Sequence, residues 1–584
     1  MHKRFRLTLA TAAAAALTGG LLTFSAATAT AADSTTVPQA DFNGDGRGDV
    51  AFSASTAHVN GKNPRLARLR RLTSPTGLGA LPVPLQHRPG PHPRARPHPS
   101  SGDPALRKRT LLLATTLATG LLTAVPVTPA TAAPSGLAGD FNGDGYRDVA
   151  IGASSADVGS VQSAGAVVVL YGSSSGVSAA RKAVITQNST GVPGTAEYGD
   201  RFGNSLAAGD LNADGYADLV VGSQYESIGD RDGVGSVTVI WGGKSGLSGG
   251  SGLPAPSSQL SEWGGYGAGI ATGDFDGDGK TDVTVTGQSY TGLYKGPFAR
   301  TGAPAGQTSV YEVGTTYDVI AGDINGDKAA ERVYPYTVSG DHGGVIGYLA
   351  YDPAGWESHP ESGYAQTMLP KADGALGSVG DINGDGYGDL VLGDYEDPRS
   401  DKPGGHKGGQ ISVWYGGPNG PDPEQKPTVI HQDTAGVPGA GEAEDRFGAA
   451  VSVGDVNGDK FADVAVGAWG EDNGTAKDSG SVTILFGSAT GLKGSGATSY
   501  TQNTAGVPGS SERDDAFGMA VRLVDLDKNG KADLVTGSGY ENGYGAVTVL
   551  RGAASGLTGT GATSFTARGV SLKGGADFGW VIGQ

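Results

Sequence analysis

A nine-residue acidic pattern recurs eight times along this chain and constrains its fold more than any other feature. With small departures it reads Asp-x-Asn/Asp-x-Asp/Asn-Gly-x-x-Asp, and an apolar run such as Val-Ala-Ile-Gly follows it. Oxygen atoms at positions 1, 3, 5 and 9 of so tight a loop suit a hard cation of the size of Ca²⁺. Repetition of this kind is typical of one supersecondary unit per copy. The copies begin at Asp41, Asp140, Asp210, Asp274, Asp323, Asp381, Asp455 and Asp525.

Repetition also explains how so long a chain can fold. Its 584 residues exceed what one hydrophobic core usually holds, but a repeat unit needs to pack only on its neighbours. The 102 glycines have no three-residue period, which excludes collagen. The chain contains no cysteine, which excludes disulfides, zinc–thiolate sites and cysteine nucleophiles.

Charge divides the chain into two unlike parts. Residues 1–132 hold 15 of the 42 basic residues but only 5 of the 59 acidic ones. The rest of the chain is therefore strongly acidic, and such a surface repels nucleic acid. Much of this acid belongs to the repeated loops, where bound cations would offset it.

Two leader-like segments precede the main array. Residues 1–32 have a basic start, an apolar stretch and a small-residue exit, which predict a secretory signal peptide. Residues 105–132 repeat these features; the alternative for their apolar stretch is a membrane span, for which it is short. Between them, residues 33–104 hold a truncated repeat copy and a basic Pro/Arg-rich segment. That segment is interpreted as a nucleic-acid-binding tail, a disordered linker or the remnant of a duplicated gene start. We expect the working protein to be 133–584.

The unit at 202–242 predicts short β-strands and no helix. A strand opens at Phe202-Gly203, the acidic loop follows, and Leu219–Gly222 is an apolar β run. Ser236–Trp241 has the alternating pattern of a β-strand and is rich in β-branched residues. A segment with a weaker strand pattern then leads to the next unit. Four strands per unit, seven times over, predict an all-β, seven-bladed β-propeller. A straight solenoid is the alternative.

The chain ends predict how the ring closes. The loop at Asp140 has no Phe-Gly opening before it, and the last Phe578-Gly579 has no acidic loop after it. Each end of the chain therefore holds the part of a repeat unit that the other end lacks. We therefore expect the C-terminal strand to complete the first blade, which also removes exposed sheet edges.

With the Phe-Gly opening, the Asp-rich loop and a close such as Val221-Gly222-Ser223, residues 133–584 resemble the FG-GAP repeat family. Its best-known members are the propellers of integrin α subunits, and secreted bacterial proteins are similar to it. The resemblance implies calcium loops on one face of the ring and ligand-binding loops on the opposite face. Departures from the pattern are Lys328 and Glu331 in the loop at 323 and Lys460 in the loop at 455. A missing glycine and a longer Glu side chain disturb the loop at 323 and make it the weakest calcium candidate.

Side-chain oxygens at positions 1, 3, 5 and 9, with a carbonyl at position 7, form the predicted Ca²⁺ ligand set. Position 12 is apolar and strands flank the loop, which excludes the EF-hand and dockerin patterns; a metal-free Asx-turn is the remaining alternative. The predicted ligands are Asp140, Asn142, Asp144, Tyr146 and Asp148; Asp210, Asn212, Asp214, Tyr216 and Asp218; Asp274, Asp276, Asp278, Lys280 and Asp282; Asp323, Asn325, Asp327 and Glu331; Asp381, Asn383, Asp385, Tyr387 and Asp389; Asp455, Asn457, Asp459, Phe461 and Asp463; Asp525, Asp527, Asn529, Lys531 and Asp533.

No catalytic constellation is recognised in the sequence. The histidines after residue 133 are scattered, with no pair at metal or triad spacing, and we expect them on surface loops; they are His342, His359, His406 and His431. An aromatic residue beside an acid recurs after the second strand, as in Tyr225-Glu226. Such pairs either bind a sugar or a basic peptide or are simply turn residues.

Taken together, these patterns predict a secreted or cell-surface calcium-binding propeller. Its expected role is a non-catalytic binding or adhesion module for an extracellular protein or glycan. No nucleic-acid partner and no stable membrane span in the mature chain are expected. The alternatives are a propeller enzyme acting on extracellular polysaccharide, as a lyase or glycosidase, and a scaffold for a separate catalytic partner.

Overall fold

The computed structural model describes residues 135, 137–255, 261–288, 290–311, 318–335, 346–351, 364–369, 372–398 and 404–583. Within them the chain forms seven four-stranded antiparallel sheets, and the helical elements amount to one short 3-10 turn, η1 (Glu541–Gly543). The predicted all-β, seven-bladed propeller is confirmed. The predicted leaders and linker at 1–132 lie outside the described residues.

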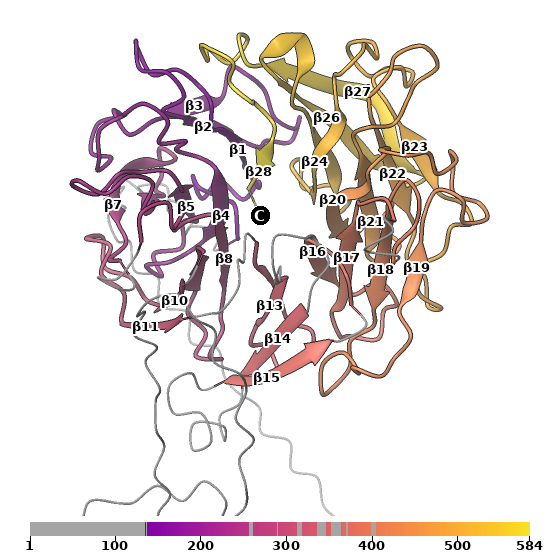
Figure 1. Cartoon of the computed structure of the whole chain (residues 1–584), viewed down its shortest axis with the longest axis horizontal. Helices are drawn as coiled ribbons and strands as arrows, with labels where there is room; N and C mark the ends of the chain where they lie inside the picture. Colours follow the sequence, from indigo (N-terminus) through magenta and orange to yellow (C-terminus); the bar gives the residue numbers. More distant parts are fainter. Residues whose placement is uncertain are drawn as a thin grey trace, which may run out of the picture. The chain divides into compact units, whose positions relative to one another are not determined.

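Six blades take their four strands in order along the chain (Figure 1). The second and third strands are the apolar, β-branched runs, and they are almost completely buried because sheets of neighbouring blades cover both of their faces. The strands of these blades are β4 (Ser205–Gly209), β5 (Asp218–Ser223), β6 (Ser236–Trp241) and β7 (Ser248–Gly252); β8 (Gly269–Gly273), β9 (Asp282–Thr286), β10 (Tyr290–Lys295) and β11 (Gly306–Tyr311); β12 (Ile320–Gly322), β13 (Glu331–Pro335), β14 (Ile346–Tyr351) and β15 (Tyr364–Leu369); β16 (Leu376–Gly380), β17 (Asp389–Asp394), β18 (Gln410–Trp414) and β19 (Thr428–Ile430); β20 (Phe447–Gly454), β21 (Asp463–Ala468), β22 (Ser481–Leu485) and β23 (Thr498–Tyr500); β24 (Phe517–Val524), β25 (Asp533–Ser538), β26 (Ala546–Ala553) and β27 (Gly556–Thr566).

The remaining blade joins the two ends of the array. Its order is β28-β1-β2-β3, so the last strand of the chain is its innermost strand. Ile151 and Gly152 of β1 pair antiparallel with Ile582 and Val581 of β28. The predicted closure by the C-terminal strand is therefore confirmed, and Figure 1 shows β28 beside β1. The other strands are β1 (Val149–Ala153), β2 (Ala166–Leu170), β3 (Lys182–Ile185) and β28 (Val581–Ile582).

The Phe-Gly opening forms the junction between one blade and the next. Phe202 makes a parallel bridge to Gly165 of the preceding blade, and its ring is fully buried. Gly203 then adopts φ +90°, and a Cβ there would lie 2.7 Å from the carbonyl oxygen of Ala166. Only glycine combines this left-handed conformation with so close an approach of two backbones.

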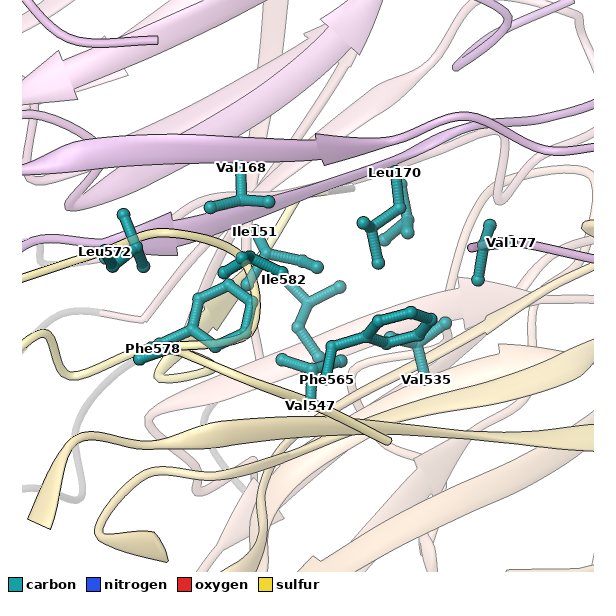
Figure 2. Packing of buried hydrophobic residues seen from close by; sticks show 14 of the residues in the cluster. Ile151, Val168, Leu170, Val177, Val535, Val547, Phe565, Leu572, Phe578 and Ile582 are labelled. Carbon is teal, nitrogen blue, oxygen red and sulfur yellow. The ribbon is translucent and has the colours of Figure 1, made fainter. Parts of the chain in front are cut away.

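The same junction closes the ring. Phe578 bridges Gly545 of the preceding blade, and the amide of Gly579 donates to the carbonyl of Gly152. Figure 2 shows the ring of Phe578 between the first and last blades, among side chains such as Ile151, Val547 and Ile582. At the inner edge, Arg522 of β24 donates to the carbonyl of Gly583.

Because Phe578 is fully buried at this junction, Phe578→Ala should lower the free energy of unfolding by about 3–5 kcal/mol. Deletion of 577–584 should lower the free energy of unfolding, and with it the melting temperature, at least as much as Phe578→Ala does. The reason is that the first blade also loses its β28 pairing. Phe202→Ala, at an equivalent junction elsewhere in the ring, is the matched control and should cost a similar amount. Thermal and denaturant melts measure both effects; an unchanged melting curve for the deletion would contradict closure.

Candidate metal and binding faces

The seven acidic loops lie at the same end of their blades. Each loop leads into the strand that follows the innermost one, as in the loop 210–218 between β4 and β5. Consecutive loops are joined by backbone hydrogen bonds: the amide of Ala217 donates to the carbonyl of Asp140 at 3.1 Å, and that of Ala532 to Asp455 at 2.7 Å. The propeller therefore places these loops in a row along one face.

Within each loop the acidic side chains cap the backbone of the turn. In the first, the Asp140 carboxylate accepts hydrogen bonds from the amides of Asp144 (3.1 Å) and Gly145 (2.8 Å). Asn142 Oδ1 also accepts from the amide of Asp144, and Asp144 Oδ1 accepts from the amide of Tyr146. These contacts are Asx-turns. They leave further lone pairs on the loop carboxylates, because each oxygen can accept more than one bond.

The loops that lack glycine at position 6 keep the same turn. Lys328 and Lys460 adopt φ values of +78° and +77°, close to the +88° of Gly145. Their amides still donate to the first aspartate, Asp323 or Asp455, at 3.0 and 2.9 Å. The backbone of the turn is thus kept, and the left-handed conformation of a non-glycine residue costs roughly 1–2 kcal/mol.

The ninth residue connects the loop to the rest of its blade. Asp148 Oδ2 accepts from the amide of Phe141 at 2.9 Å, and its Oδ1 accepts from the amide of Gly172, after β2, at 2.8 Å. Phe141, the second loop residue, is itself buried. The six aspartates at this position bind the equivalent two amides in their own blades. Glu331 accepts from the amide of Ile324 at 2.6 Å.

Burial makes the ionised form of this carboxylate costly. Desolvation and the neighbouring loop carboxylates, against the effect of the backbone hydrogen bonds, raise the pKa of Asp148 to about 8 and that of Asp218 to about 7. The same causes raise the pKa of Glu331 to about 8. A buried carboxylate with acidic neighbours is stabilised by a cation, so the donor set fits Ca²⁺.

Two loops bring three carboxylates together. One oxygen each of Asp274, Asp276 and Asp282 lie within 4.8 Å of one another, and the same holds for Asp525, Asp527 and Asp533 in the last loop. The structure thus supplies the close oxygen cluster that a cation needs, in part of the predicted ligand set.

The sequence did not predict the basic side chains that lie at the rim of the loops. Lys295 contacts Asp276 at 2.8 Å and Arg551 contacts Asp527 at 2.9 Å. Arg181 and Arg300 pair with the fifth-position carboxylates of two other loops, at 2.9 and 2.6 Å. Lys295 and Arg551 lie in strands of the same blade as their loops, whereas Arg181 lies just before β3 and Arg300 comes from the next blade. No local motif marks them.

At the opposite end of the blades, the acids after the second strand are used between blades. Glu226 accepts a hydrogen bond from Gln187 Nε2 of the preceding blade at 2.6 Å, and Glu541 accepts one from Gln502 at the same distance. Gln432 bonds Glu471 in the same way. Each glutamine belongs to a recurring phrase, Thr/His-Gln-Asn/Asp followed by Gly-Val-Pro-Gly. The aromatic–acid pairs therefore include inter-blade contacts.

The aromatic members of these pairs stay partly accessible. Tyr225 is 40% exposed, and the guanidinium of Arg201 lies 5.5 Å from its ring centroid. Arg446 lies over Trp469 at 4.7 Å. The result is a set of rings and guanidinium groups on the face opposite the acidic loops, a composition common at binding surfaces.

The histidine prediction was wrong in one respect. His406 and His431 lie on loops, as expected, but they stack with ring centroids 3.6 Å apart. The sequence separates them by β18 and β19, and only the blade brings them together. His342 and His359 lie outside the described residues.

Comparison with known proteins agrees with this architecture. The model of the FG-GAP repeat matches residues 132–170, 202–240, 447–485 and 517–550, and an FG-GAP-like repeat model matches 274–334. The chain carries FG-GAP repeats. Three of the matched segments begin at the Phe-Gly openings at 202, 447 and 517, and together the segments contain six of the seven acidic loops.

Relatives of these FG-GAP repeats include integrin α subunits. Integrin alpha-PS2 of Drosophila melanogaster is 29% identical over 218 residues, covering 37% of this chain and 12% of that protein. Integrin alpha-IIb of Mus musculus is 33% identical over 176 residues, covering 30% and 15%. Phosphatidylinositol-glycan-specific phospholipase D of Rattus norvegicus is 30% identical over 188 residues, covering 32% and 21%. The alignments thus span about a fifth or less of these relatives. Among the described residues, no helix is long and apolar enough to cross a membrane.

The inter-blade glutamates make stability depend on pH. Burial, together with the nearby Asp200 and Glu197 carboxylates and against the hydrogen bond from Gln187, raises the pKa of Glu226 from 4.5 to about 7. The folded state then binds the proton more tightly, so this contribution is complete below pH 4.5 and is lost as pH rises through about 7. Glu226→Gln keeps an acceptor for Gln187 without the charge, and should raise stability at pH 8 by on the order of 1 kcal/mol after solvent screening.

Denaturant melts of this variant at pH 5 and pH 8 measure the effect. Glu424→Gln, at an exposed acid of the same chain, is the control. An equal pH dependence in Glu226→Gln and the parent chain would contradict the assignment.

Proposed function

We propose that this protein is a secreted, calcium-binding β-propeller that acts as a non-catalytic binding or adhesion module. The observation that carries the proposal is the row of acidic loops along one face, which use the same turn and the same buried ninth carboxylate. Bound cations would neutralise these carboxylates and leave the opposite face to contact a ligand.

In this proposal each loop holds Ca²⁺ through oxygen atoms at positions 1, 3, 5 and 9. The ion supplies positive charge that stiffens the turn and does no chemistry. The ninth residue, such as Asp148, already contacts the backbone of its own loop at Phe141 and the backbone after β2 at Gly172. Calcium bound there would fasten the loop to the start of one strand and the end of another.

The ligand proposed is an extracellular protein or glycan. The similarity to integrin α subunits supports an adhesion role and a location outside the cell or on its surface. Exposed rings with guanidinium groups near them, such as Tyr225 with Arg201, suit stacking on sugars or contact with peptide side chains.

A second candidate is a propeller that serves a catalytic partner or carries out hydrolysis itself. The similarity to a phosphatidylinositol-glycan-specific phospholipase D favours this candidate, since that protein is an enzyme by name. The two candidates differ in whether a bound ligand is turned over.

Calcium binding is tested with a substitution that keeps the turn. In Asp385→Asn the amide oxygen can still accept from the backbone of Tyr387, but the charge is lost. Metal-free stability should stay within about 0.5 kcal/mol of the parent. Saturating Ca²⁺ should stabilise the parent by about 2–3 kcal/mol per site at a hundredfold excess over Kd, and the variant by less.

Calorimetric titration and melts with and without EGTA measure these quantities. Asp422→Asn, an acid outside the loops that also caps a local turn, is the matched control. Purified protein that carries no Ca²⁺ and melts identically in EGTA would refute the calcium proposal.

Ligand class is tested by a glycan array and a pull-down from extracellular material, each with and without EGTA. The binding-module proposal expects retention of a ligand, weakened by chelation, with no change in its covalent structure. Mass spectrometry of the recovered ligand decides between the candidates, because cleaved product would overturn the non-catalytic assignment.

A further inference from the structure

A cluster of two imidazoles and one carboxylate lies in the blade built from β16 to β19, apart from the acidic loop of that blade. His406 precedes β18, whereas His431 and Asp433 follow β19. One potential ligand atom from each of the three lies within 4.8 Å of the others. His406 Nε2 and Asp433 Oδ2 are 3.4 Å apart. The loop between β17 and β18 and the segment after β19 thus meet here, at the end opposite the acidic loop.

The hydrogen bonds of His406 determine which of its nitrogens is free. Its Nδ1 lies 2.8 Å from the carbonyl oxygen of Lys407, which can only accept, so Nδ1 carries the proton. In the neutral ring Nε2 then holds a lone pair, and this lone pair faces the Asp433 carboxylate. Two acceptors in contact need a cation or a proton between them. A carbonyl bound to the distal nitrogen is also how proteins orient a metal-binding histidine.

Asp433 is oriented in a similar manner. Its Oδ1 accepts from the amide of Gly441 at 3.0 Å, which leaves Oδ2 toward His406. The Nδ1 atom of His431 is buried and has no hydrogen-bond partner. The cluster therefore holds an unpartnered nitrogen, a lone pair set by a backbone carbonyl and a carboxylate oxygen held by a backbone amide.

Two other blades, called the sister blades here, carry the same recurring phrase, at 186–194 and 501–509. They have different residues at the positions of His431 and Asp433. The recurring phrase has Thr186 and Thr501 where His431 stands. Its backbone is the same in all three, because the amide of each of these residues donates to a hydroxyl three positions later, at 2.9 to 3.0 Å. The side chain of His431 is therefore not required by the turn.

The same holds for the carboxylate. Asn188 and Asn503 occupy the position of Asp433, and their Oδ1 atoms accept from the amide eight residues later, just as Asp433 Oδ1 does. An asparagine would satisfy the backbone, so the charge of Asp433 serves no local structural need.

A third position changes together with these two. Gly441 stands where the sister blades have Ala196 and Ser511. A Cβ at Gly441 would lie 2.6 Å from the carbonyl oxygen of Lys407, 3.0 Å from Cε1 of His406 and 3.2 Å from Oδ2 of Asp433. Glycine therefore leaves room both for the imidazole and for the carbonyl that contacts its Nδ1.

We infer that His406, His431 and Asp433 form a binding site for a divalent transition-metal ion of the zinc class, separate from the calcium loops. Two imidazoles and one carboxylate are ligands that suit such an ion, and oxygen-preferring Ca²⁺ does not favour them. The Asp433 side chain is half exposed, so a further coordination position faces solvent. The rings stack with planes 7° apart and must rotate for their lone pairs to converge on one ion.

The test titrates the full chain with Zn²⁺ by calorimetry, with Ca²⁺ saturating so that the acidic loops do not compete. The His406→Gln/His431→Thr chain should lose one zinc site relative to the parent. Asp433→Asn should weaken that site about tenfold or more, while keeping its bond to Gly441. His431→Thr and Asp433→Asn each restore a sister-blade residue, and melting curves confirm that both variants fold.

The matched control is His342→Gln/His359→Gln, which removes the same number of imidazoles elsewhere and should keep the site. Anomalous diffraction at the zinc edge from crystals of the parent chain should place the ion between His406 and His431. Equal zinc stoichiometry in the parent and in His406→Gln/His431→Thr would overturn the inference, as would an equal loss in the control.

Discussion

One buried carboxylate per blade organises the end of the propeller that carries the acidic loops. Asp148 shows the principle: one oxygen accepts from the start of its loop and the other from the residue after β2. Losing either bond would leave a buried charge or a buried amide unpaired, which is costly in a dry environment. The loop therefore cannot move independently of the blade, and any cation it binds acts on the whole sheet.

Neighbouring blades are joined by different residues at the acidic-loop end, at the Phe-Gly junction and at the opposite end. At the acidic-loop end, backbone bonds such as that from Ala217 to Asp140 connect neighbouring loops. The Phe-Gly junction connects the opening of one blade to the start of the third strand of the preceding blade, and the Gln–Glu bonds connect the blades at the opposite end. Because the last junction uses Phe578 against Gly545, the ring closes with the same contact that joins the other blades.

The opposite face follows a different rule, since its loops vary while the scaffold beneath them stays constant. The Thr-Gln-Asn phrase keeps its backbone bonds in three blades, yet one copy carries His431 and Asp433 in place of threonine and asparagine. A repeat that already satisfies its backbone is free to exchange side chains that the fold does not need. Function in repeat proteins is expected at such positions.

The sequence by itself determined the all-β class, the blade number and the position of each acidic loop. Those properties depend on local signals: alternating apolar strands, glycine turns and acids at fixed spacing within nine residues. Tertiary structure alone decided that Arg300 pairs with Asp214, that Glu226 receives Gln187, and that His406 meets His431. The two members of each pair lie far apart along the chain, in different blades or in different loops of one blade. Their contact depends on how the sheets pack, and no local sequence pattern predicts it.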